Sequence, residues 1–326
     1  MNTNTIKTVD YASDPHLSPA VKEFLRPLNG GGSGLETLPA DEARNALVGL
    51  QESFPVDYSG IKESEKTITH LGYTVTLNIV KPENANGIMP AFMFTHGGGW
   101  ILGDYPTHKR MVRDLVVLTG YTGVFVNYTR APEARYPQAV HEVYAVSQWL
   151  TENGNEIGVD GTKLGIVGNS AGGNLATASA LKAIEEGKAA YKVKVLMWPV
   201  TNADFDNTSW TQFGEERFLT ASLMKWMWDQ YIPAGQRNEI YASPLQATPE
   251  QLKDLPPTLI QVAENDILRD EGEAYGRKLS SAGVEVTTVR YNDVIHDWGL
   301  LNGLAHLPQT KALFIQAAAH LKKYLE

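Results

Sequence analysis

Short apolar runs alternate with longer amphipathic stretches over most of the chain, from residue 67 to residue 325. Runs of this length favour strands, and the amphipathic stretches between them favour helices. We expect strands at 67–80 (one strand or a hairpin), 90–95, 123–128, 164–167, 193–198, 258–263 and 284–291. We expect helices near 19–28, 38–52, 107–120, 138–152, 171–187, 271–282 and 308–325. This alternation predicts an α/β fold, with a mostly parallel sheet covered by helices on both faces.

Two segments interrupt the alternation. Residues 1–60 are helical and loop-rich in pattern, and their glycine run Gly30–Gly34 predicts a mobile loop. Residues 202–247 are rich in aromatic side chains and too long for a simple connection. We expect both segments to form a helical cap on a main domain made of residues 61–201 and 248–326.

Composition narrows the possible partners and cofactors. The chain has 326 residues, 43% hydrophobic and 20% charged, as in soluble globular proteins. Its net charge of −9 opposes non-specific binding to nucleic acid, so we expect no nucleic-acid partner. The absence of cysteine excludes disulfides, iron–sulfur clusters and thiol nucleophiles. Since the chain also lacks an H-E-x-x-H sequence, we expect no catalytic metal.

The beginning of the chain carries no targeting signal. Residues Met1 to Asp14 are polar and lack the basic and apolar regions of a signal peptide. No apolar run approaches the roughly 18 residues that span a bilayer. We therefore expect a cytoplasmic protein without a membrane span.

The segment Gly168–Gly172 matches the pattern G-x-S-x-G around Ser170. It follows the apolar run 164–167 and precedes a predicted helix. Strand, tight turn and helix are the setting in which this pattern presents a nucleophilic serine. We take Ser170 as the candidate nucleophile.

A serine hydroxyl needs a base to take its proton. Downstream of Ser170 the chain holds three histidines: His296, His306 and His320. His296 follows the predicted strand 284–291, and catalytic loops lie at the carboxyl ends of such strands. His306 follows no strand, and His320 lies in the predicted C-terminal helix, so His296 is the candidate base.

The base needs a carboxylate to orient it, and three aspartates compete for that role. Asp266 follows the predicted strand 258–263 and is our first choice. Asp270 lies four residues further on, where we expect it to cap the next helix. Asp297 ranks third, because a sequence neighbour of His296 cannot easily reach the ring Nδ1.

The segment His96–Trp100 (HGGGW) follows the predicted strand 90–95. Consecutive glycines leave backbone N–H groups free to point into a cleft, where they can bind a developing oxyanion. We expect His96 to order this loop by hydrogen bonding and not to act as the base. Trp100, Trp210 and Trp226 are candidates for pocket walls, although tryptophan more often packs in a core.

Together these motifs resemble the hormone-sensitive-lipase-like family of carboxylesterases, which is widespread in bacteria. The likeness runs from His96 to about His296. The family blocks HGGG, YRLAPE, GDSAGG and DPLRDEG correspond here to His96–Gly99, Tyr128–Glu133, Gly168–Gly173 and Asp266–Gly272.

The resemblance implies an α/β-hydrolase fold with a helical cap and no cofactor. It implies that Ser170 is the nucleophile, Asp266 the orienting acid and His296 the base. It places the oxyanion donors on the N–H groups of Gly98, Gly99 and Ala171, with Gly97 shaping the loop. Family members hydrolyse short acyl esters, and dimers are common among them.

Three positions depart from the family pattern. Asn169 replaces the usual acidic residue before the serine, and Asp297 replaces the usual small residue after the histidine. Thr129 and Arg130 replace Arg-Leu. None of these changes removes a predicted catalytic residue, but the first two alter the charge around nucleophile and base. They therefore bear on pH optimum and substrate range.

We therefore expect a serine carboxylesterase that acts on a small-molecule ester with a short acyl chain or an aryl group. Hydrolysis of other acyl bonds, such as amides or lactones, is one alternative, because the same three residues serve all acyl transfers. A small-molecule receptor on the same fold is another. Such receptors typically lose the catalytic histidine, whereas Ser170, Asp266 and His296 are all retained here. A homodimer is possible by analogy with the family.

Overall fold

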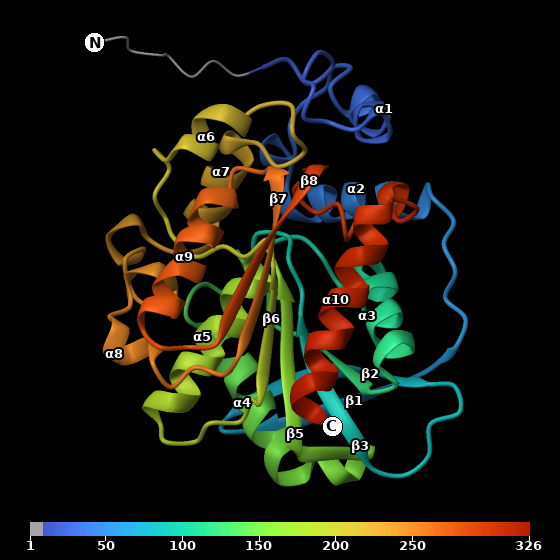
Figure 1. The fold of residues 1–326 in the computed structure, drawn as a ribbon, viewed down its shortest axis with the longest axis vertical. Coiled ribbons are helices and arrows are strands. Elements are labelled where there is room, and N and C mark those ends of the chain that lie inside the picture. Colours follow the sequence, from blue (N-terminus) through green and yellow to red (C-terminus); the bar gives the residue numbers. More distant parts are fainter. Residues whose placement is uncertain (1–8) are drawn as a thin grey trace.

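A computed structural model describes residues 9–326 of the chain. Its centre is an eight-stranded sheet with the order β1-β2-β4-β3-β5-β6-β7-β8 (Figure 1). The β1–β2 and β2–β4 pairs are antiparallel, and all other neighbouring strands are parallel. The strands are β1 Ile61–His70, β2 Tyr73–Pro82, β3 Met89–Thr95, β4 Thr122–Asn127, β5 Val159–Asn169, β6 Val193–Met197, β7 Thr258–Asn265 and β8 Val286–Ile295. The prediction of a mostly parallel α/β sheet is confirmed.

The limits of several predicted strands differ from those observed, and the strand predicted at 164–167 spans Val159–Asn169. The stretch predicted at 67–80 is a hairpin that begins earlier, at Ile61, and turns at Leu71 and Gly72. The last strand ends at Ile295, later than predicted, because Ile295 pairs with Asn265 beyond an irregularity in the β7–β8 ladder. The longer β8 places His296 directly at its end.

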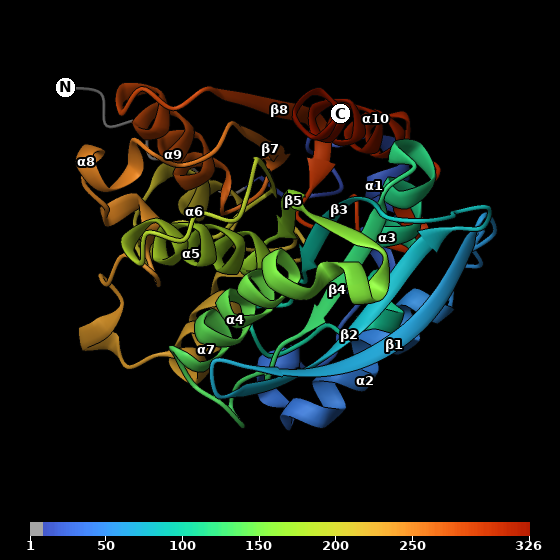
Figure 2. The same cartoon turned by 90° about the horizontal axis from the view of Figure 1, so that it is seen from below.

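Helices cover both faces of the sheet (Figures 1 and 2). Helices α3 and α10 pack together on one face, and α4, α5 and α9 pack on the other. The helices are α1 Pro19–Leu28, α2 Ala40–Glu52, α3 Tyr105–Thr119, α4 Gln138–Asn153, α5 Ala171–Glu185, α6 Thr208–Phe213, α7 Ala221–Tyr231, α8 Pro249–Leu252, α9 Arg269–Ser281 and α10 Pro308–Leu325.

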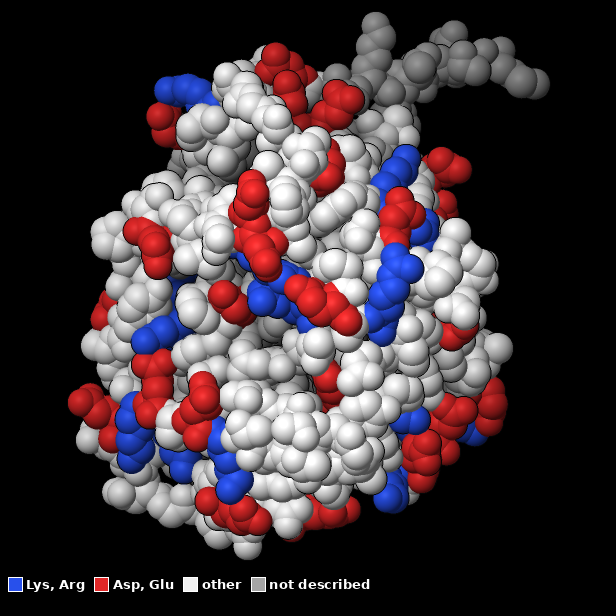
Figure 3. All heavy atoms as spheres, turned by 180° about the vertical axis from the view of Figure 1, so that it is seen from behind, with Lys and Arg blue, Asp and Glu red and all other residues white. Residues whose placement is uncertain are grey.

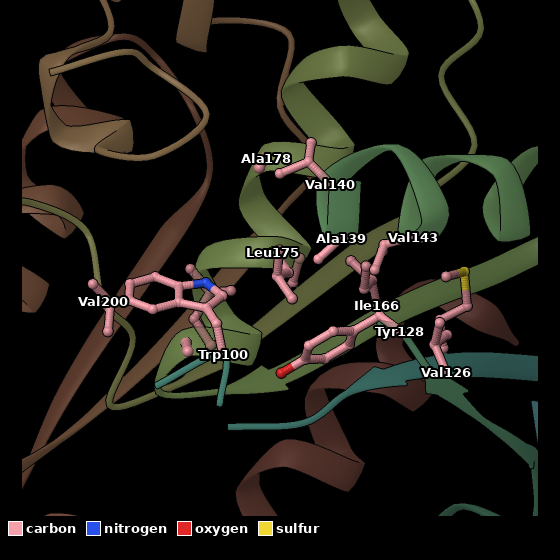
Figure 4. Close-up of a cluster of buried hydrophobic side chains, with 14 of the residues drawn as sticks. Trp100, Val126, Tyr128, Ala139, Val140, Val143, Ile166, Leu175, Ala178 and Val200 are labelled. Atoms are coloured by element: carbon pink, nitrogen blue, oxygen red, sulfur yellow. The ribbon is translucent and has the colours of Figure 1, made fainter. Parts of the chain in front are cut away.

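The central strands carry apolar residues toward both faces of the sheet because both of their faces are buried. Met93 and Ile166 point into the core on the α4–α5 side, whereas their chain neighbours Phe94 and Val167 point into the core under α3 and α10. Figure 4 shows the first of these cores, in which side chains of β5, α4 and α5 gather, among them Ile166, Val143 and Leu175. Continuous apolar runs are typical of such doubly covered parallel strands.

Segments from distant parts of the chain meet at one end of the sheet. Figure 1 shows α1, α2, α6 and α7 gathered at the end toward which β7 and β8 point. The glycine run Gly30–Gly34 lies on the surface after α1. The division into cap segments 1–60 and 202–247 and a main domain stays a prediction, as does the mobility of the glycine run. Residues 1–8 of the first segment lie outside the described residues.

Charged side chains are dispersed over the surface. On the face seen in Figure 3, Lys and Arg side chains are interspersed with Asp and Glu side chains and do not form one continuous basic patch. None of the helices in the described part of the chain is both long and apolar enough to cross a membrane. Neither observation tests for a partner, so the expectation about nucleic acid stays a prediction.

Lys194 on β6 is an unusual member of the core, since none of its surface is exposed. Its Nζ lies 5.6 Å from the ring centroid of Tyr275 on α9. Among residues 9–326 the Nζ atom has no hydrogen-bond partner. Because burial disfavours the charged ammonium group, the pKa of Lys194 falls to about 7. Near neutral pH the core therefore holds either a neutral amine or an uncompensated charge.

We expect the protein to become more stable as the pH rises above 7, because the unfolded chain then keeps a proton that folded Lys194 has released. Between pH 7 and pH 9 this group should add about 2 kcal/mol to the free energy of unfolding. Lys194→Met should therefore stabilise the protein more at pH 6 than at pH 9. Denaturant unfolding at both pH values checks this, with Lys188→Met at an exposed lysine as the control. Equal stabilisation by Lys194→Met at both pH values would contradict the prediction.

Candidate active site

Ser170 occupies a sharp turn between β5 and α5. Its backbone has φ 52° and ψ −124°, a conformation that is costly for a residue with a side chain. The Ser170 N–H donates to the carbonyl oxygen of Met197 on β6 (2.9 Å), which holds the turn in place. A Cβ at Gly172 would collide with the carbonyl oxygen of Thr95 on β3. The glycine pattern around Ser170 therefore reflects close packing against neighbouring strands.

The three residues chosen from the sequence lie in one hydrogen-bonded row. His296 Nδ1 is 2.7 Å from Asp266 Oδ2, and His296 Nε2 is 3.1 Å from Ser170 Oγ. An ionised carboxylate can only accept, so Nδ1 carries the hydrogen and Nε2 is left to accept from the Ser170 hydroxyl. All three residues are buried. They meet because β5, β7 and β8 run parallel and end at the same edge.

The competing residues lie elsewhere or make other contacts. The prediction that Asp270 caps α9 is wrong. The helix begins after Leu268, and Asp270 lies in its first turn. Its Oδ2 accepts from the N–H of Ser209 at the start of α6 (2.9 Å). His306 is exposed, and His320 is half-buried on α10.

Asp297 is buried beside His296. Its Oδ2 lies 3.8 Å from His296 Nε2, on the opposite side of the ring from Asp266. Its Oδ1 accepts from the indole N–H of Trp198 (2.7 Å) and from the Asn169 amide (3.4 Å). Asp297 thus approaches Nε2 and leaves Nδ1 to Asp266.

This arrangement shifts the pKa values of both neighbours. Burial opposes protonation of His296, but the charges of Asp266 and Asp297 outweigh burial and raise the pKa of His296. Burial raises the pKa of Asp297. The site therefore favours a protonated imidazole more than an exposed histidine would.

The glycine loop follows β3 and faces Ser170. The carbonyl oxygen of Gly98 accepts from the N–H of Leu102 (2.8 Å), which closes the loop into a turn with Gly98 at φ 96°. The Gly97 N–H donates to Asn169 Oδ1 (2.9 Å). Within the described chain, no group accepts from the N–H of Gly98 or Gly99. Ala171 begins α5, so its N–H has no acceptor within the helix.

His96 packs against the glycine loop. Its Nδ1 lies 2.8 Å from the carbonyl oxygen of Gly97, and its ring stacks on Tyr128 with centroids 4.2 Å apart. Burial holds the pKa of His96 well below the usual value, so the ring is neutral. These contacts are those of a residue that orders the loop.

A small cavity of about 50 Å³ adjoins Ser170 and His296. Its walls are mostly apolar and come from α2, the glycine loop and the segment around α7. They include Leu35, Leu47, Leu102, Phe218, Leu219, Leu223 and Met227. Two larger hollows, of about 400 and 530 Å³, open near Phe54 and Phe314, away from these residues.

None of the three tryptophans considered as pocket walls lines this cavity. Trp100 is buried and stacks on Tyr231 with centroids 4.1 Å apart, and Trp210 packs on Phe205. Phe218 and Met227 form the wall instead. The sequence carried no local sign of this, because both positions depend on how the segment 202–247 folds back over Ser170.

The described residues contain no group of three or more His, Cys, Asp or Glu side chains arranged to hold a metal ion.

Comparison with known proteins gives concordant matches. A family model described as the α/β-hydrolase fold matches residues 92–300. An ethyl acetate hydrolase of Pseudomonas putida is 30% identical over 86% of this chain and 92% of that enzyme. A carboxylesterase of Mycobacterium tuberculosis is 30% identical over 81% of this chain and 83% of its own. The solved structure of a thermostable esterase from Pseudomonas putida is 52% identical, with a TM-score of 0.94 over 96% of this chain and 99% of that one.

We expect Asp297→Asn to lower the pKa of His296, because it removes one of the charges that favour the imidazolium form. Asn169→Asp should raise that pKa, because it adds a carboxylate to the buried site. An NMR titration of the His296 ring protons measures both shifts. The control is Glu264→Gln. Glu264 lies on β7, and its side chain hydrogen-bonds to the exposed His16. An unchanged midpoint in both site variants would contradict the assigned charges.

Proposed function

The chain belongs to the α/β-hydrolase family, in its hormone-sensitive-lipase-like branch, and from this premise we propose that it is a serine carboxylesterase acting through Ser170. Its family and its esterase relatives identify it as a carboxylic ester hydrolase. The observation that carries the assignment to Ser170 is the row Asp266–His296–Ser170, with contacts of 2.7 and 3.1 Å.

In the proposed reaction the Ser170 oxygen attacks the ester carbonyl carbon while His296 Nε2 takes the hydroxyl proton. Asp266 holds the ring and stabilises the imidazolium that forms. The tetrahedral intermediate collapses, and the C–O bond to the alcohol breaks as His296 returns the proton to the leaving oxygen. Water then attacks the acyl-enzyme, with His296 again acting as base, and releases the acid.

The oxyanion of the intermediate needs preorganised donors. We assign this role to the N–H groups of Gly98, Gly99 and Ala171. The assignment is supported by the absence of another acceptor for the Gly98 and Gly99 N–H groups within residues 9–326. Gly97 is excluded as a donor because its N–H is already bonded to Asn169.

The proposed substrates are esters with a short acyl chain or an aryl group. The apolar cavity of about 50 Å³ beside Ser170 suits a small acyl group better than a long chain. A receptor without catalytic activity is disfavoured, because the base and its carboxylate are retained and the relatives are named as esterases. Cytoplasmic location and a homodimer remain predictions from the sequence and the family.

Ser170→Ala and His296→Ala should each lower kcat by roughly 10⁴-fold or more while the protein stays folded, because each removes a member of a unit that acts together. Hydrolysis of p-nitrophenyl acetate, with circular dichroism as the folding check, measures this. His306→Ala changes an exposed histidine and should keep wild-type turnover. Loss of turnover in His306→Ala with retention in His296→Ala would refute the assigned base.

The value of kcat/KM should fall as the acyl chain of p-nitrophenyl esters lengthens from butyrate to palmitate, because the cavity beside Ser170 is small. A series from acetate to palmitate, assayed below the aggregation limit of the long esters, measures this. Higher kcat/KM for palmitate than for acetate would rule out the short-chain assignment.

A further inference from the structure

We propose that Arg217, paired with Asp14, is a positioning residue that fixes Phe218 as a wall of the catalytic cavity and so limits the size of ester that enters. The inference rests on the proposed function, because it concerns the same cavity. The residues involved belong to two parts of the chain: residues 9–29, called here the N-terminal arm, and residues 214–219, called the wall loop.

The wall loop lies directly over the catalytic residues. Phe218 and Leu219 line the cavity that also contains Ser170 and His296. Two residues of this loop, Glu216 and Phe218, have positive φ angles of 59° and 72°. Side chains disfavour this conformation, and it persists only where surrounding contacts hold it. The position of Phe218 therefore depends on what anchors the loop.

The anchors come from the N-terminal arm. Arg217 Nη2 donates to Asp14 Oδ2 and to the carbonyl oxygen of Val9, both at 2.8 Å. Arg217 is 1% exposed and Asp14 is 4% exposed, so solvent does not screen this pair. The N–H of Tyr11 donates to Glu216 Oε2 (3.2 Å).

Two further contacts join the arm to the same loop. The side-chain amide of Asn29 donates to the carbonyl oxygen of Glu216 (3.2 Å). The ring of Phe24 on α1 packs on Phe218, with centroids 6.4 Å apart. Each of the two residues with positive φ thus contacts the arm.

The arm is itself fixed to the strands that carry the proposed acid and base. The side-chain amide of Asn265, next to Asp266, donates to the carbonyl oxygen of His16 (2.7 Å). The N–H of Ser18 donates to the carbonyl oxygen of Asp293 on β8 (3.2 Å). The arm therefore bridges the ends of β7 and β8 to the wall loop. Through Arg217 it sets the distance between Phe218 and the reacting groups.

A buried ion pair that served only stability would leave the choice of substrate unchanged when it is broken. A positioning pair would change that choice in the same way as removal of the wall. The test compares Arg217→Met and Asp14→Ala with Phe218→Ala, using p-nitrophenyl esters from acetate to octanoate and alkyl acetates from ethyl to octyl. Glu23→Gln is the control, because it breaks an exposed pair with Arg26 on the same arm.

We expect Phe218→Ala to raise kcat/KM for the longer esters relative to acetate, in at least one series, by about tenfold. Arg217→Met and Asp14→Ala should produce the same shift, and Arg217→Lys a smaller one. The double variant Arg217→Met with Phe218→Ala should shift no further than Phe218→Ala alone, because both act through one side chain. Glu23→Gln should keep the wild-type profile.

An unchanged profile in folded Arg217→Met, or additive effects in the double variant, would overturn the proposal. If Arg217→Met does not fold, Asn29→Ala removes an exposed hydrogen bond to the wall loop without leaving a buried charge. It should give faster hydrogen exchange at residues 214–219 and a smaller shift in the same direction. The proposed function is tested separately by Ser170→Ala, which should lose activity. If Arg217→Met is active and its chain-length profile is unchanged, only the role of Arg217 is refuted.

Discussion

The turn at Ser170 is the constraint on which the rest of the site depends. A positive φ at a serine costs about 1–3 kcal/mol, so the neighbouring elements have to hold it. β3 does so through Thr95, whose hydroxyl donates to the carbonyl oxygen of Gly172 (2.7 Å), and β6 does so through the carbonyl of Met197. Both strands flank β5 in the sheet. The order of the strands thus secures a conformation that the local sequence disfavours.

Two departures from the family pattern compensate for each other in space. Asn169 uses its oxygen for the Gly97 N–H and its amino group for Asp297. The side chain of Asn169 therefore joins the glycine loop to Asp297. An acidic residue at position 169 would still accept from Gly97, but it would face the carboxylate of Asp297 without a hydrogen to offer. The Asn169 amide can donate a hydrogen bond to the carboxylate of Asp297, which follows His296 in this chain.

The sheet and the row of Ser170, His296 and Asp266 could be placed from the sequence because each depends on a local pattern. Apolar runs mark strands that are buried on both faces, and polar residues directly after such runs lie at one edge. Phe218 could not be found in this way, because its place depends on contacts with residues nearly two hundred positions earlier. Asp270 was misplaced for a related reason: its partner, Ser209, belongs to a distant segment. The order of strands in the sequence predicts which residues meet at the common edge of the sheet. It does not predict contacts made by segments that fold back over that edge.

The position of β8 at the edge of the sheet has a consequence for the order in which the molecule matures. During synthesis the turn at Ser170 leaves the ribosome well before His296, which lies 126 residues later in the chain. Leu321 and Leu325 on α10 pack close to Gly165 on β5, so this part of the sheet stays uncovered on the α3–α10 face until α10 is made. A growing chain therefore carries an uncovered apolar patch on β5, and a Ser170 without His296 beside it, until residues 296–325 have been added, since chains fold progressively from the N-terminus as they emerge.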